Sequence, residues 1–216
     1  MRTDGQGMGS PLAGLRSGRY TRCMSEQQDS SAFGTLAVRP LRRTEYDQLV
    51  SSGVFAGERL ELLRGRLLPM SPQGVAHMFV VRRLYQLLFL SLQGKATVLS
   101  QMPLAISGES EPEPDVCVVP LSPDDYASAK PERALLVVEV ADSTLLRDAS
   151  VKAQLYAECG VPEYWMIDVK SRVARVHRGP VGGGWTSVNE HGTGATLSPQ
   201  AFPDVAVPLD AILPPP

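Results

Sequence analysis

Two short apolar segments, each with a carboxylate at one end, constrain the fold of this chain more than any other feature. Residues 116–119 (VCVV) follow Pro114 and Asp115, and residues 134–138 (ALLVV) end at Glu139. Apolar runs of this length indicate buried strands, and their separation suits two strands joined by a loop. A charge at the edge of a buried strand is costly unless it is paired, and a divalent metal ion is a suitable partner.

The composition limits the classes of protein to which the chain can belong. It has 216 residues, a length that favours one domain, and its 43% hydrophobic and 20% charged residues are usual for a globular protein. The formal net charge of −2 argues against a nucleic-acid coat protein but allows an enzyme with one local basic patch. No apolar run approaches the ~18 residues of a membrane span, so no membrane partner is expected. The three widely spaced cysteines favour a reducing cytoplasm.

The pattern along the chain predicts one folded domain between two irregular ends. Residues 1–35 are rich in Gly, Ser, Arg and Gln and lack apolar periodicity, which is typical of a disordered leader. Both Met1 and Met24 are candidate first residues. Residues 36–210 form the expected domain, and residues 211–216 form a Pro-rich tail.

Hydrophobic periodicity and turn residues predict the order of helices and strands. We expect helices at residues 44–50, 71–93 and 147–159. We expect a hairpin at 60–68 and strands at 96–101, 115–119, 134–140, 163–168, 172–178 and near Trp185. The predicted buried positions are Val75, Phe79, Leu84, Leu87, Leu88 and Leu92 on the long helix, and Val151, Leu155 and Cys159 on the next. Strands and helices do not alternate regularly, which favours a mixed α/β (α+β) fold with a central mixed sheet flanked by helices.

Two further residues are candidates for the same site as the strand carboxylates. Lys152 lies in the first turns of a predicted helix, which can fold back onto the strand that ends at Glu139. Glu61, in the hairpin, is a candidate third carboxylate. A metal-dependent phosphodiesterase needs converging carboxylates and a positive charge for the developing phosphorane. Each residue taken singly has an ordinary structural explanation, but their joint occurrence in this order favours the chemical one.

The motifs resemble those of known nucleases. Pro114-Asp115 followed by Glu139-Val140-Ala141 resembles the PD-(D/E)xK signature, with alanine in place of its lysine. The surrounding sequence resembles the Uma-two family of restriction-endonuclease-like proteins over about residues 40–190. The matching stretches are residues 60–72, His77, residues 113–119 and residues 136–168, of which Lys152-x-x-x-Tyr156 with Gly160-Val161-Pro162-Glu163-Tyr164-Trp165 is the most specific.

The resemblance implies a restriction-endonuclease-like core and Mg²⁺- or Mn²⁺-dependent hydrolysis of a nucleic-acid phosphodiester, with DNA as the expected substrate. By this resemblance, Asp115 and Glu139 bind the metal ion, and the backbone carbonyl of Val140 adds a ligand. Lys152 supplies the lysine that the signature lacks, and Glu61 completes the site.

Other interpretations stay open at this stage. The displaced lysine and the weak basic character also suit a non-catalytic nucleic-acid or protein-binding module on the same fold. A small-molecule metal hydrolase is a third interpretation, although nothing in the sequence marks its substrate pocket. His77 resembles a family position and could approach the cleft, but an ordinary helix histidine is the simpler explanation. An enzyme should bring Asp115, Glu139 and the Lys152 ammonium within a few ångströms of one another. A homodimer would suit cleavage of both strands of a duplex.

Overall fold

The computed structural model describes residues 38–141 and 146–215; the side chains of residues 146–150 are not described. The chain divides into two units, Met1–Val38 and Arg39–Pro216, and every helix and strand below belongs to the second. The expected leader at residues 1–35 therefore lies outside the described residues.

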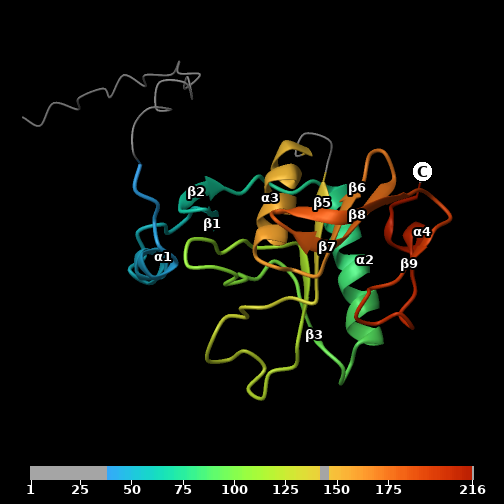
Figure 1. Cartoon of the computed structure of the whole chain (residues 1–216), viewed down its shortest axis with the longest axis horizontal. Helices are drawn as coiled ribbons and strands as arrows, with labels where there is room; N and C mark the ends of the chain where they lie inside the picture. Colours follow the sequence, from blue (N-terminus) through green and yellow to red (C-terminus); the bar gives the residue numbers. More distant parts are fainter. Residues whose placement is uncertain (1–37, 142–145, 216) are drawn as a thin grey trace, which may run out of the picture. The chain divides into compact units, whose positions relative to one another are not determined.

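The centre of the second unit is a six-stranded mixed sheet in the order β3-β4-β5-β6-β7-β8 (Figure 1). Its strands are β3 (Thr97–Leu99), β4 (Val116–Val119), β5 (Leu136–Ala141), β6 (Glu163–Asp168), β7 (Val173–Val181) and β8 (Gly184–His191). Strands β5 and β6 are parallel, and every other neighbouring pair is antiparallel. Every residue of β4, β5 and β6 is buried, which explains why the sequences of β4 and β5 are almost continuously apolar.

Helices cover both faces of this sheet. The helices are α1 (Arg43–Ser51), α2 (Val75–Ser91), α3 (Leu146–Glu158) and the short α4 (Leu209–Ile212). Leu84 and Leu88 of α2 share one buried cluster with Val138 of β5, whereas Tyr156 of α3 shares a second cluster with Val137. Because successive strand residues point to opposite faces, α2 and α3 lie on opposite sides of the sheet. The predicted mixed sheet flanked by helices is confirmed.

A separate hairpin of β1 (Leu60–Leu63) and β2 (Arg66–Pro69) is fixed beside the loop that precedes β4. Leu62 pairs with Glu111 through two backbone hydrogen bonds, of 3.3 and 2.7 Å. Gly65 makes the turn with a φ of 72°, and a β-carbon at this position would overlap Pro40. The hairpin expected at residues 60–68 is thus present, and its first strand is held against the central part of the fold.

The differences from the predicted elements lie in helix phase and at the C-terminus. Helix α2 begins at Val75, which is 86% exposed instead of buried, and His77 lies on the buried face. Val151 of α3 is 44% exposed, although a buried stripe was predicted to include it. Residues Ile212 and Leu213 are buried in the main core, so the C-terminal segment joins the core beyond residue 210, where a tail was expected.

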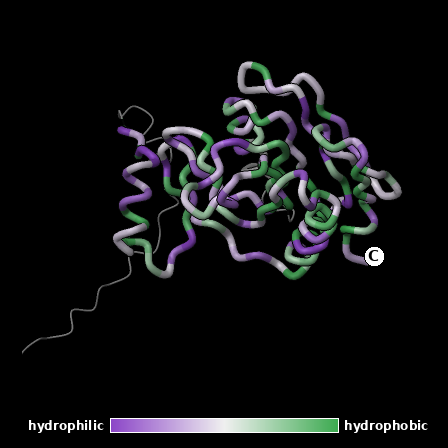
Figure 2. The backbone as a smooth tube through the Cα atoms, turned by 90° about the horizontal axis from the view of Figure 1, so that it is seen from below, coloured by the Kyte–Doolittle hydropathy of each residue, from purple (hydrophilic) through white to green (hydrophobic). Residues whose placement is uncertain are grey.

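Hydrophilic and apolar segments are distributed as these layers require. In Figure 2, α1 is coloured mainly as hydrophilic, and Tyr46 is its one buried residue, with its hydroxyl donating to the Leu60 carbonyl over 2.8 Å. A small second sheet pairs β9 (Thr196–Leu197) with β10 (Val207–Pro208), neither of which was predicted. Across the described part of the chain, no helix has the length and apolar character needed to cross a membrane.

The burial of α2 gives a direct test of its phase. We expect Leu84→Ala, which empties a fully buried position, to lower the free energy of unfolding by about 2–5 kcal/mol. Val75→Ala in the same helix should change it by less than about 0.5 kcal/mol, because the valine is exposed. Urea denaturation followed by circular dichroism measures both. Equal losses in the two variants would show that α2 is oriented differently.

Candidate active site

The two strand carboxylates lie side by side at the edge of the β4–β5 ladder. Val116 pairs with Val138 in register, so the next position places Asp115 opposite Glu139. The Asp115 Oδ2 atom accepts a hydrogen bond of 2.8 Å from the backbone N–H of Val140. Asp115 is 8% exposed and Glu139 9% exposed, so both carboxylates are nearly withdrawn from water. Glu139 lies within β5 rather than at its end, because the strand continues to Ala141.

Three more groups hold Asp115 in place. The Nε2 atom of His77, from the first turn of α2, lies 3.0 Å from Asp115 Oδ2. The Gln101 side-chain amide lies 3.4 Å from Oδ1, and the Ser100 hydroxyl donates to the Asp115 carbonyl over 2.9 Å. His77 is thus part of the site, a role that its position on an amphipathic helix did not distinguish from that of an ordinary core histidine.

Lys152 joins the sheet to the hairpin. Its Nζ atom lies 3.0 Å from Glu61 Oε2 and 3.1 Å from Glu139 Oε1. The lysine side chain is only 11% exposed, and Glu61 is 7% exposed. Helix α3 follows β5 and packs on that face of the sheet, which returns the ammonium to the strand from which the chain came. Lys152 therefore lies within hydrogen-bonding distance of both Glu139 and Glu61, as the sequence predicted.

Tyr156 is a further member of the site. Its hydroxyl donates a 2.7 Å hydrogen bond to Glu139 Oε1, the same oxygen that Lys152 contacts. Residues four apart on a helix lie on one face, so Lys152 and Tyr156 reach the carboxylate together. The Lys-x-x-x-Tyr spacing was visible in the sequence, but an aromatic residue in an amphipathic helix is ordinarily a core residue, and Tyr156 is also fully buried.

The charges of the site do not balance. Three buried carboxylates, Glu61, Asp115 and Glu139, face one ammonium, that of Lys152. Burial raises the pKa of Glu139 to about 7 against an ordinary value of 4.5; Lys152 opposes this rise, and Asp115 and Glu61 add to it. Burial by itself would lower the pKa of Lys152, but Glu139 and Glu61 raise it above its ordinary value. The lysine is therefore charged, and the site retains an excess of negative charge.

This excess fits a bound divalent cation. Mg²⁺ is commonly held by one or two carboxylates, with water and substrate oxygens as its other ligands. Asp115 and Glu139 supply two adjacent carboxylates, and the pKa of Glu139, raised first by burial, stays high because Lys152 only partly opposes that rise. Within residues 38–141 and 151–215, no group of three or more His, Cys, Asp or Glu side chains is gathered as a ligand set. Asp115 and Glu139 remain the two predicted carboxylate ligands, and the Val140 carbonyl remains a predicted extra ligand.

The order of elements around the site defines a class of protein. A restriction-endonuclease-like core is formed by helix α2, the antiparallel strands β3, β4 and β5, helix α3 and the parallel strand β6. Its acidic residues lie on β5 and directly before β4. The profile of the Uma2 family, described as "putative restriction endonuclease", matches residues 43–210. The chain belongs to this family.

A solved structure shares the fold. It is the crystal structure of a "putative nuclease belonging to DUF820" from Anabaena variabilis, with a TM-score of 0.66 and 14% sequence identity. The similarity covers 80% of the present chain and 97% of the other. At this identity the similarity establishes the fold alone. No curated protein sequence matches the chain.

The burial of Glu139 predicts a pH-dependent stability in metal-free protein. Between pH 4.5 and about 7, the folded state keeps a proton that the unfolded state has released. The free energy of unfolding should therefore fall as the pH rises through this window, by up to about 3 kcal/mol. Glu139→Gln cannot ionise and should give a flatter dependence, whereas Glu58→Gln, at an exposed position, should follow the wild type. Urea denaturation at a series of pH values in EDTA measures this, and equal slopes for wild type and Glu139→Gln would contradict it.

Proposed function

We propose that this protein is a metal-dependent endonuclease that hydrolyses phosphodiester bonds of DNA. One observation carries the proposal: two adjacent buried carboxylates, Asp115 and Glu139, with a lysine ammonium 3.1 Å from the second. A buried cation beside two acids at one end of the β4–β5 ladder suits attack on an anionic phosphodiester, where negative charge develops on the phosphoryl oxygens. Membership of the Uma2 family supports a nuclease as the class of enzyme.

The chain's own residues have separate tasks in this proposal. Asp115 and Glu139, with the Val140 carbonyl, would hold Mg²⁺ or Mn²⁺. When bound, such an ion polarises phosphoryl oxygens and lowers the pKa of bound water. An ammonium has three donors, and two of those on Lys152 are directed at Glu61 and Glu139. Among the described residues these two carboxylates are the ion-pair partners of Lys152. In this proposal the third donor acts on a phosphoryl oxygen or on the attacking water, whose attack expels the 3′ oxygen.

Contacts around the carboxylates support their orientation. Tyr156 donates to one oxygen of Glu139, and His77 contacts one oxygen of Asp115. These contacts fall on Glu139 Oε1 and Asp115 Oδ2, so a cation would be held by Glu139 Oε2 and by Asp115 Oδ1, which the Gln101 amide also contacts at 3.4 Å. Preorganised carboxylates avoid part of the reorganisation that binding would otherwise require.

The test is cleavage of supercoiled plasmid, single-stranded DNA and RNA with Mg²⁺ or Mn²⁺. We expect metal-dependent cleavage of DNA that falls at least about 100-fold in Asp115→Asn and in Lys152→Met. The matched controls are Asp204→Asn and Lys95→Met, both at exposed positions, and they should cleave like the wild type. Calorimetric titration with Mn²⁺ gives a second readout, because Asp115→Asn should weaken binding of the metal without DNA present.

The other outcomes separate the remaining interpretations. Cleavage that persists unchanged in Asp115→Asn would identify a contaminating nuclease. Preference for RNA would keep the reaction but change the substrate. A folded wild-type protein that binds nucleic acid and cleaves none of the substrates with either metal would instead be the binding module that the displaced lysine also allowed.

A further inference from the structure

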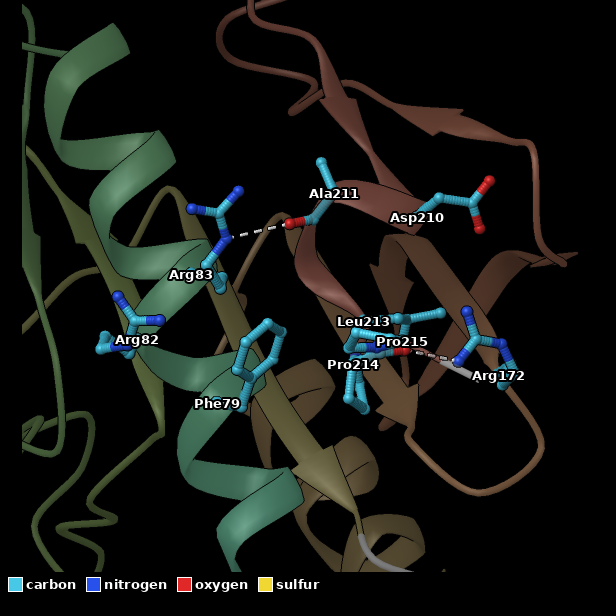
Figure 3. A pocket seen from close by; sticks show the side chains of 9 residues that line it. All are labelled: Phe79, Arg82, Arg83, Arg172, Asp210, Ala211, Leu213, Pro214 and Pro215. Carbon is cyan, nitrogen blue, oxygen red and sulfur yellow. Dashed lines mark hydrogen bonds between the residues drawn. The ribbon is translucent and has the colours of Figure 1, made fainter.

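A hollow of about 500 Å³ lies on the other side of the sheet from Lys152, between α2 and the C-terminal segment (Figure 3). Three arginines line it. Arg82 and Arg83 project from α2, and Arg172, in the turn between β6 and β7, lies on the other side of C-terminal residues 213–215 in this view. The one acidic residue in the lining is Asp210. The lining side chains therefore carry a net charge of +2, three positive against one negative, although the whole chain has a net charge of −2.

In the part of the chain that the structure describes, these arginines have no acidic partner. None of the ion pairs among the described residues involves Arg82, Arg83 or Arg172. Asp210 uses its Oδ2 atom to accept a hydrogen bond of 2.9 Å from the backbone N–H of Gly194. Three positive charges line the hollow against one negative charge, so an anion bound there would be attracted.

Two of the arginines are also held in position by the fold. The Nε atom of Arg83 donates to the Ala211 carbonyl over 3.1 Å, and Nη1 of Arg172 donates to the Pro214 carbonyl over 2.8 Å. Each guanidinium has five N–H donors, so most remain for a ligand. Arg82 is exposed and lies over the Phe79 ring, with its Cζ atom 5.7 Å from the ring centroid. The planar donor fork of arginine matches the oxygens of phosphate.

We propose that the Arg82–Arg83–Arg172 hollow binds a backbone phosphate of nucleic acid, outside the site of cleavage. This inference rests on the proposed function for the identity of the polymer. Arg82 and Arg83 follow His77 by five and six residues, about 7.5–9 Å along the helix axis, and project from other faces of α2. The hollow is thus separate from the cleft, and in this proposal one strand of several nucleotides occupies both.

The experiment measures binding of fluorescent single-stranded DNA to the full chain in EDTA, where binding does not depend on cleavage. For an oligonucleotide of about 30 residues, Arg82→Gln should weaken binding about tenfold, the equivalent of one charge-assisted hydrogen bond. It should also reduce the slope of log K against log salt by about 0.7. Arg133→Gln removes another exposed arginine, outside this hollow, and should leave both quantities unchanged.

Arg172→Gln is the second variant, and thermal denaturation establishes that each variant is folded. The inference is overturned if Arg82→Gln and Arg172→Gln bind the long oligonucleotide as tightly as Arg133→Gln does. This holds even if the wild type cleaves DNA. Titration with inorganic pyrophosphate distinguishes the source of the phosphate. Binding of pyrophosphate that Arg82→Gln abolishes, with unchanged binding of DNA, would identify a free phosphate ligand and overturn the proposal. If the wild type cleaves no nucleic acid but binds DNA more tightly than Arg82→Gln does, the proposed function is overturned and the inference about the hollow stands.

Discussion

The buried ammonium of Lys152 is the interaction on which the arrangement of the site depends. It lies between Glu61 on the hairpin and Glu139 on the central sheet, and the helix that carries it covers the sheet face to which Glu139 belongs. Breaking one side of a buried ion pair leaves an uncompensated charge, which commonly costs about 3–5 kcal/mol. The hairpin, β5 and α3 are therefore constrained to assemble together, since each contributes a charge that is costly to bury without the others.

Much of the central sheet could be predicted because its strands are buried on both faces. Residues in β4 and β5 form nearly uninterrupted apolar runs, and this removes the ambiguity that partly exposed strands carry. The same reasoning located Asp115 and Glu139, because a carboxylate next to such a run is conspicuous. The position of Lys152 could also be predicted, because a helix that follows a strand commonly packs back against that strand. By contrast, β9 and β10 are two residues each, too short for periodicity to detect.

The rest of the site depends on contacts between segments that are distant in the sequence, and local sequence patterns do not predict such contacts. Glu61 looks like an exposed hairpin residue until Leu62 pairs with Glu111 and brings the hairpin against the fold. The burial of His77 depends on where α2 begins: a start at residue 71 and a buried Val75 put the wrong face toward the sheet. In the sequence, Tyr156 is typical of a core residue. Its hydrogen bond to Glu139 becomes visible only in the three-dimensional structure.

The distribution of charge explains why the composition carries so little information about an anionic partner. A net charge of −2 provides no general attraction for a polyanion. Yet the acidic charge includes three buried carboxylates, whose charge a single divalent cation would offset. Three arginines that form no ion pair within the described residues line one hollow. Salt bridges elsewhere, such as Arg178 with Glu163, neutralise other cations locally. A phosphate backbone would therefore interact with the unpaired charges at these particular places. The net charge of the whole chain does not measure these local charges.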